Sequence, residues 1–182
     1  MDAEASRVLN FWFEELNPEL WFAKKPDLDR EILQKFLGTY RKVERCETFR
    51  WRATPRGRLA EVIVLDQFSR NIFRDTPEAF KNDGLALALS QEAIATGDDQ
   101  KLDRDERVFL YMPFMHSESD LIHQEAVRLF SQQGLENSLE YELEHKILID
   151  RFGRYPYRNE ILGRPSTKEE LAYLKMPGSA TF

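Results

Sequence analysis

Cysteine is nearly absent from this sequence, and its apolar runs are short. The single cysteine, Cys46, excludes a disulfide within the chain and favours a reducing compartment, so we predict a cytoplasmic protein. The apolar segments around Val62–Leu65 and Gly84–Ser90 fall far short of the roughly 20 residues needed to cross a bilayer. The N-terminal segment MDAEASR lacks the cationic and apolar regions of a secretory signal. We therefore predict a soluble protein that is not exported and does not bind membranes.

Basic residues are fewer than acidic residues in this sequence. Lysine and arginine number 26 against 32 aspartates and glutamates, which gives a formal net charge of −6. Proteins that bind nucleic acid usually carry a basic face, so this balance argues against that class. The 182 residues suit one domain, and 13 phenylalanines among 42% hydrophobic residues can form a substantial core. We predict a single α-helical domain over residues 1–182, without a linker or a convincing fixed-period repeat.

Helical periodicity recurs along the chain. Apolar residues follow the helical period in residues 4–15, before the Asn17-Pro18 break. A second stripe with a period near 3.6 comprises Leu28, Ile32, Phe36, Tyr40 and Val43. The run Val62–Leu65 has the length of a short buried strand. Helix-start residues precede it and no partner strand is evident, so we predict a helix there.

Capping residues mark the expected helix ends. Thr54-Pro55 and Thr76-Pro77 each place a capping side chain before a proline, and Gly97 would end the second of these helices, near residues 77–96. Four later helices are expected from capping spacing, at Asp103 and Glu106, Ser117 and Asp120, Asn137 and Glu140, and Ser166 and Glu169. The expected ends of the first three are Pro113, Gly134 and Gly153. The pattern predicts an all-α fold of about eight helices joined by short loops.

The densest polar group in an apolar segment directly follows Val62–Leu65. It comprises Asp66, Gln67, Arg70, Asn71 and Arg74. Asp66, Arg70 and Arg74 are four residues apart, so in a helix they share one face and Asp66 can pair with Arg70. Two interpretations stay open. The group is a structural ion pair at a helix end, or its arginines bind a carboxylate or phosphate.

A second polar group lies after the expected helix end at Gly153. Four arginines occur in residues 151–164, namely Arg151, Arg154, Arg158 and Arg164, and Asn159 lies among them. Gly153 and Pro156 indicate a fixed, irregular backbone. Such arginines either satisfy carbonyl groups at a helix end or project into a cleft.

A third polar group contains His116, Ser117 and Glu118, with Gln124 one to two turns later. Histidine titrates near neutral pH, so His116, Glu118 and His145 are the candidate catalytic residues. The plainer interpretation is that Ser117 caps a helix, Glu118 complements its dipole and His145 lies in the core. Histidine pairs at metal-ligand spacing are lacking, and so are phosphate-binding, dinucleotide and G-x-S-x-G motifs. We therefore predict no metal and no cofactor.

Three segments in this order resemble the bacterial domain of unknown function 924 family. They are LDQFSRNIFR, HSE with the later Gln124, and RFGRYPYRNEILGRPST followed by EEL. The resemblance covers nearly the whole chain and includes the N-terminal FWF and the later WF. It implies a bacterial protein with a tetratricopeptide-like fold, in which antiparallel helix pairs stack into a right-handed superhelix, and it implies no established activity. One departure is Ser69, where the family often carries proline, and this blurs where that helix ends.

Three functions compete. The one we rank first is a cleft that binds an anionic small molecule, with or without catalysis, through Arg70, Arg74, Arg154 and Arg158. If the ends of their helices meet, Asp66 and Glu118 would offset the crowded positive charge. The second is a helical-repeat module that binds a peptide or a partner protein. In the third, the polar groups only hold helix ends together. A homodimer also stays open.

Overall fold

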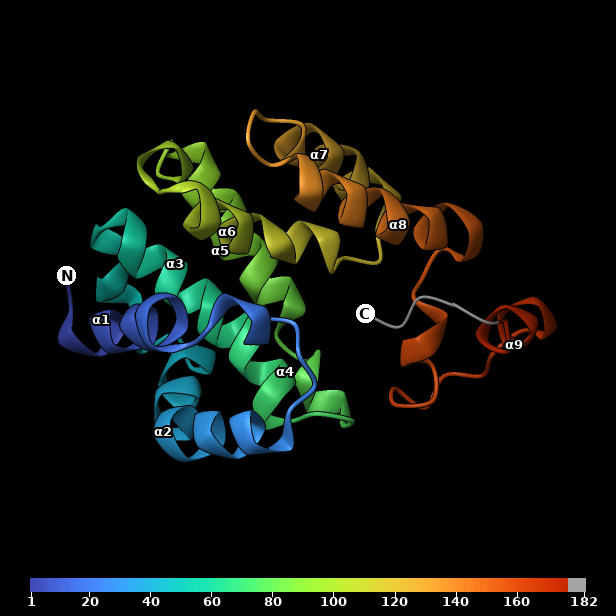
Figure 1. The fold of residues 1–182 in the computed structure, drawn as a ribbon, viewed down its shortest axis with the longest axis horizontal. Coiled ribbons are helices and arrows are strands. Elements are labelled where there is room, and N and C mark those ends of the chain that lie inside the picture. Colours follow the sequence, from blue (N-terminus) through green and yellow to red (C-terminus); the bar gives the residue numbers. More distant parts are fainter. Residues whose placement is uncertain (177–182) are drawn as a thin grey trace. The chain divides into compact units, whose positions relative to one another are not determined.

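A computed structural model describes residues 1–176, and every regular element within them is a helix (Figure 1). The all-α prediction is confirmed. The α-helices are α1 (Ala3–Asn10), α2 (Pro26–Glu44), α3 (Pro55–Ile63), α4 (Ser69–Ile72), α5 (Asp83–Ala95), α6 (Arg104–Met115), α7 (Asp120–Phe130), α8 (Glu136–Phe152) and α9 (Lys168–Leu174). The π-helical segments are η1 (Phe11–Glu15) and η4 (Val64–Phe68). The 3₁₀ turns are η2 (Pro18–Leu20), η3 (Phe49–Ala53), η5 (Pro77–Ala79), η6 (Asp99–Lys101) and η7 (Pro156–Arg158). None of the helices described is both long and apolar enough to cross a membrane.

The chain divides into two compact units. The first comprises Met1–Arg74 and Glu78–Pro113, and the second comprises Asp75–Pro77 and the chain from Phe114 onward. In the first unit α3 packs against α1 and α5, and α2 packs against α4. In the second unit α7 packs along α8, and α9 packs against η7. A single domain over residues 1–182 and a tetratricopeptide-like superhelix stay predictions.

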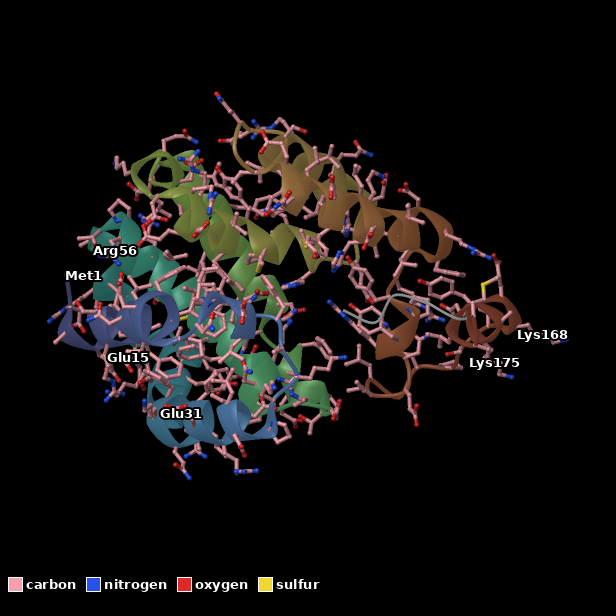
Figure 2. All side chains as sticks on the ribbon, viewed as in Figure 1. Met1, Glu15, Glu31, Arg56, Lys168 and Lys175 are labelled. Atoms are coloured by element: carbon pink, nitrogen blue, oxygen red, sulfur yellow. The ribbon has the colours of Figure 1, made fainter. Side chains whose placement is uncertain are left out.

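The stripe on α2 forms one side of the core of the first unit. All five of its residues, from Leu28 to Val43, are buried, as the period predicted. The ring of Phe36 lies 5.0 Å from that of Phe11 and 4.7 Å from that of Phe68. Charged side chains such as Glu31 of α2 and Lys168 of α9 extend away from their helices (Figure 2). The apolar face of α2 is therefore enclosed by aromatic side chains.

The segment around Val62–Leu65 is helical, as predicted. The Thr54 side chain caps α3 by accepting a hydrogen bond from the Gly57 N–H at 3.1 Å, and Pro55 stands at the first helical position. Gly57 is required here, because a Cβ atom would lie 2.0 Å from the Trp51 carbonyl oxygen. Beyond Ile63 the helix widens into the π segment η4, and every residue of η4 is buried.

Three predicted helix limits are wrong, and one of them is the end at Gly134, because α7 already ends at Phe130. Thr76-Pro77 begins only the short turn η5, and α5 starts later, at Asp83. The turn between η5 and α5 is bonded to helix α2. The Asn82 side chain donates to the Tyr40 hydroxyl at 2.8 Å and does not cap α5. Pro113 lies inside α6, which continues to Met115. A proline inside a helix removes its own N–H donor and crowds the carbonyl of residue i−4, yet α6 runs two residues past it.

Three predicted caps are displaced by one or two residues. The cap of α7 is Ser119, not Ser117, whose carbonyl oxygen instead bonds to His123. Helix α8 begins at Glu136, so Asn137 is not its cap. The cap of α9 is Thr167 in a full capping box, because the Ser166 hydroxyl is occupied by Asn159. The capping box formed by Asp103 and Glu106 and the helix end at Gly153 are confirmed.

We predict that Phe36→Ala lowers the free energy of unfolding by about 3–5 kcal/mol, because it opens a cavity between aromatic rings. Urea denaturation followed by far-UV circular dichroism measures this loss. Leu33→Ala on the same helix is the control, since Leu33 is 37% exposed and should cost much less. A loss below about 1 kcal/mol for Phe36→Ala would mean that this face is not enclosed.

Candidate functional site

The first polar group, in the first unit, is an internal network of ion pairs. Asp66 is fully buried, and its carboxylate lies 3.3 Å from the Arg70 guanidinium, as the four-residue spacing predicted. Arg70 also donates two hydrogen bonds of 3.0 Å to Asp83 on α5. Gln67 donates to Asp66 at 2.6 Å and also reaches the sulfur of Met112.

A second carboxylate, that of Asp29, accepts hydrogen bonds from the remaining polar residues of this group, Asn71 and Arg74. Arg74 donates to both oxygens of Asp29, at 2.6 and 2.7 Å, and Asn71 donates to the same carboxylate at 2.8 Å. Asp29 and Asp83 were not predicted as partners, because they lie 45 and 13 residues away from the arginines they bind. No local pattern links them. The arginines that looked available for an anion are thus bound bidentately by carboxylates of the chain.

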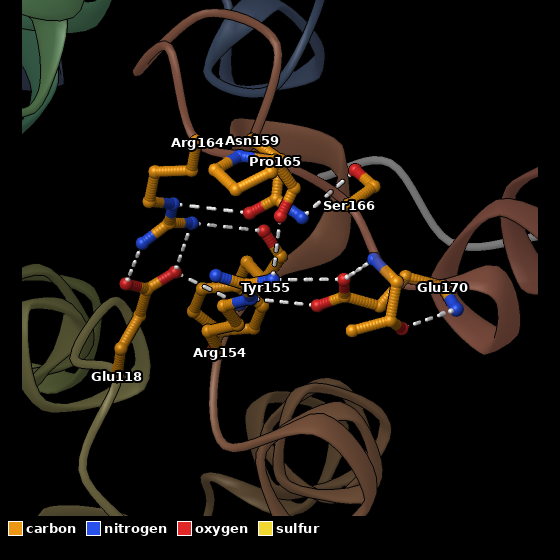
Figure 3. Close-up of polar contacts among 9 residues, drawn as sticks. Glu118, Arg154, Tyr155, Asn159, Arg164, Pro165, Ser166 and Glu170 are labelled. Carbon is orange, nitrogen blue, oxygen red and sulfur yellow. Dashed lines mark hydrogen bonds and ion pairs between the residues drawn. The ribbon is translucent and has the colours of Figure 1, made fainter.

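In the second unit, Glu118 joins two loops that are distant in sequence (Figure 3). Arg164 donates to both of its carboxylate oxygens, at 2.6 and 2.9 Å, and the Tyr155 N–H donates at 2.8 Å. Burial raises the pKa of the Glu118 carboxyl, but Arg164 and the Tyr155 N–H lower it by more, so its net pKa is below the ordinary value. Glu118 is therefore an anion that holds the loop after α8, and it has no proton to donate at neutral pH.

Arg154 makes an equivalent pair with Glu170 of α9. It donates to both carboxylate oxygens, at 2.6 and 2.9 Å, and to the Pro165 carbonyl at 3.0 Å. The Thr167 N–H bonds to the same carboxylate, which completes the capping box of α9. Glu170 is only 2% exposed. Asn159 continues the network by accepting from Arg164 and donating to Ser166.

Three further candidates of this unit, Arg158, His116 and His145, lie near Tyr155. The Arg158 guanidinium lies 4.5 Å from the centre of the Tyr155 ring and donates to the His116 carbonyl at 3.1 Å. The rings of His116 and His145 lie 6.4 Å apart. Burial lowers the pKa of His145 to about 3, so its imidazole is neutral at pH 7. Gln124 lies elsewhere, exposed on α7 and bonded to Asp120.

A buried pair that we did not predict connects α7 to α8. His123 Nδ1 lies 2.7 Å from a Glu142 oxygen, and His123 Nε2 lies 2.8 Å from the Ser117 carbonyl oxygen. A carbonyl accepts only, so Nε2 carries a hydrogen, and one further proton lies between Nδ1 and the carboxyl. Burial raises the pKa of Glu142 more than His123 lowers it. Both side chains are fully buried, so the pair joins the helices and offers no open catalytic base.

The loop held by this network borders a surface hollow of about 460 Å³. Its lining residues come from η7, the following loop and α9, and are Pro156, Tyr157, Glu160, Ser166, Leu171 and Leu174. Glu160 is the one charged residue in this lining, and it is exposed. Leu171 is 46% exposed. The lining is mainly apolar, with one hydroxyl from Ser166 and a single negative charge, and we take the hollow as the candidate functional site.

Comparison with known proteins places the chain in a family. Residues 8–178 match the model of a family described as bacterial protein of unknown function (DUF924). The chain belongs to this family. The resemblance carried by the three polar segments is thereby confirmed, and no curated protein matches the chain.

A solved structure of similar sequence has the same fold. The structure of a protein of unknown function, ATU0120 from Agrobacterium tumefaciens, matches with a TM-score of 0.90 and 37% identity. The match covers 95% of this chain and 97% of that chain. The family therefore extends the fold to a second protein and brings no activity with it.

The Arg154–Glu170 pair predicts how stability depends on pH. Hydrogen bonding to Arg154 lowers the pKa of Glu170 to about 2, from an ordinary value of 4.5. A depressed folded-state pKa stabilises the fold above the unfolded-state value, and this contribution is lost as pH falls toward the folded-state value. We expect Glu170→Gln to cost about 1–3 kcal/mol of unfolding free energy at pH 7 and markedly less at pH 3.

Urea denaturation at both pH values tests this expectation. The control is Glu169→Gln, because Glu169 is 62% exposed and its pair with Arg151 is solvent-screened, so little change is expected at either pH. A Glu170→Gln penalty that is the same at pH 7 and pH 3 would contradict a stabilising role for the charged pair.

Proposed function

We propose that this protein is a binding module that holds a segment of a partner protein in the hollow lined by η7, its following loop and α9. The observation that supports this most is the composition of the lining. Proline, tyrosine and two leucines supply apolar surface, and Glu160 supplies the one charge. A volume of about 460 Å³ is in the range of known ligand sites and has room for one or two side chains.

The partner chemistry follows from the sign of that charge. A ligand in this hollow meets a carboxylate and a tyrosine ring, and a lysine or arginine side chain satisfies both. Its methylene groups lie well on leucine and proline while its charged end stays in water. An apolar residue next to the cation would fill the leucine side. We therefore propose an exposed peptide segment that pairs a basic residue with an apolar one.

The anionic small molecule that we ranked first has less support. Arg70, Arg74 and Arg154 each bind a carboxylate of the chain bidentately. An anion would have to displace that carboxylate, which is already held at short range. The hollow itself contributes a negative charge. Among the three functions, partner binding is thus the one that the geometry favours, while the arginine groups have the structural role.

Two finer expectations accompany this proposal. A tetratricopeptide-like stacking of helix pairs would suit a module that binds segments of other proteins, as solenoids of this kind do. A cytoplasmic location would suit the single cysteine, Cys46, which is exposed.

Fluorescence anisotropy with short labelled peptides tests the proposal. We expect a peptide with adjacent arginine and leucine to bind, and a matched peptide with glutamate in place of arginine to bind at least about tenfold more weakly. Glu160→Gln should weaken the first peptide by a similar factor. Glu169→Gln is the matched control, because Glu169 is an exposed acid of α9 that does not line the hollow.

Three results would count against the proposal. Unchanged binding of the arginine peptide by Glu160→Gln would place its site elsewhere. Preferential binding of the glutamate peptide, or of inorganic phosphate, would favour the function in which the protein binds an anionic small molecule. A free amine such as agmatine that binds as tightly as the peptide would identify a small-molecule site.

A further inference from the structure

The helix α8 carries large apolar side chains that face solvent. Ile147 is 61% exposed and Leu143 is 45% exposed. They are four residues apart, so they lie on the same face of the helix. The opposite face is buried, since Glu142, His145 and Ile149 pack inside the unit. Single exposed apolar residues are ordinary, but two adjacent ones on a rigid 17-residue helix form a surface that a partner helix fits.

Acidic residues surround this apolar pair. Glu136, Glu140, Glu144 and Asp150 are all exposed, and they lie eleven, seven, three and three residues from Ile147. Such spacings place all four on the face of Ile147. Within residues 1–176 no ion pair is described for Glu140 or Glu144. This outer face of α8, defined by Leu143, Ile147 and these four acids, is therefore apolar at its centre and negative at its edges.

The two cations of α8, Lys146 and Arg151, already pair with acids, one of which, Asp150, belongs to this face. Lys146 pairs with Asp120 of α7 at 3.1 Å and also with Asp150. Arg151 pairs with Glu169 at 2.9 Å. The pair between Lys146 and Asp120 also brings the start of α7 beside this half of α8, and the next residue there, Leu121, is 72% exposed. Neither cation offsets the charge at Glu140 and Glu144.

We propose that the outer face of α8 docks an amphipathic helix of a partner protein whose apolar stripe is flanked by lysine or arginine. Leu143 and Ile147 would pack into the apolar stripe, in the manner of a helix laid on a helix. Glu136, Glu140 and Glu144 would meet the flanking cations, which sets the partner and its orientation. This surface lies on α8 and not on the hollow, so the inference is independent of the proposed function.

Charge disfavours a second copy of this chain as the occupant. An antiparallel copy of α8 centred between Leu143 and Ile147 would set Glu140 of each chain opposite Asp150 of the other. A parallel copy would set Glu140 against Glu140 and Glu144 against Glu144. The net charge of −6 on each chain adds to the repulsion. A basic helix meets neither obstacle.

The test uses two labelled helical peptides of about 15 residues, one built from leucine and lysine and one from leucine and glutamate, with binding read by fluorescence anisotropy. We expect the lysine peptide to bind in a salt-dependent manner and the glutamate peptide not to bind. The double variant Leu143→Ser, Ile147→Ser should weaken the lysine peptide at least about tenfold. Tyr141→Ser is the matched control, because Tyr141 is 59% exposed on α8 but lies off this face. Thermal melts of both variants should match that of the native chain, since all three side chains are exposed.

A charge reversal makes the expectation sharper. The double variant Glu140→Lys, Glu144→Lys should lose the lysine peptide and gain affinity for the glutamate peptide. Equal binding of the lysine peptide by the native chain and the Leu143→Ser, Ile147→Ser variant would overturn the proposal, because attraction would then be electrostatic only. Sedimentation that shows a dimer abolished by the same variant would make a second copy the occupant, and would overturn it too.

Discussion

The conformation of the second unit after α8 depends on one carboxylate, that of Glu118. The chain from Gly153 to Thr167 contains the short turn η7 and further turns held by local backbone hydrogen bonds, such as that from the Arg164 N–H to the Asn159 carbonyl at 2.8 Å. Glu118 ties these turns to the segment before α7 by accepting from Arg164 and from the Tyr155 N–H. Arg164 then orients Asn159, and Arg154 attaches α9 through Glu170. The hollow has a lining of defined shape because this series of ion pairs fixes the loop.

The same rule explains the polar group of the first unit. Buried carboxylates such as Asp66 are tolerated only when they are paired and hydrogen-bonded, and a guanidinium does both with one side chain. Arginines placed beside such acids look like an anion site in the sequence, because their partners are not near them in the chain. The two surfaces proposed to bind a partner contain none of these paired arginines. The hollow and the outer face of α8 both combine apolar side chains with acids.

The fold was predictable where the signal is local. The α2 stripe ending at Val43, the cap at Thr54 and the end at Gly153 depend on residues within one or two turns of one another, and the structure agrees with them. Predictions failed where a distant side chain decides the outcome. Asn82 bonds to Tyr40 and delays α5, and Ser166 bonds to Asn159 and leaves the cap to Thr167.

The candidate site shows the same limit more strongly. The segment after Gly153 was recognised as a fixed loop with functional potential, and it does border the hollow. Glu118 was expected to offset positive charge there, but its pairing with Arg164 and that of Glu170 with Arg154 could not be assigned, since 46 and 16 residues separate them. The His123–Glu142 pair gave no signal at all. A histidine and a glutamate 19 residues apart on two helices resemble any surface pair until the packing is known.

The π segment η4 has a consequence for how this chain tolerates insertions and deletions in evolution. A π turn holds more residues than an α turn, so Val64–Phe68 accommodates what amounts to one inserted residue in an otherwise continuous helix. A descendant that lost one residue there would keep an unbroken helix, yet every later side chain would rotate by about 100° around its axis. Arg70 would turn away from Asp83, and Arg74 from Asp29. The bulge therefore makes the length of this segment, and not only its composition, a requirement of the fold.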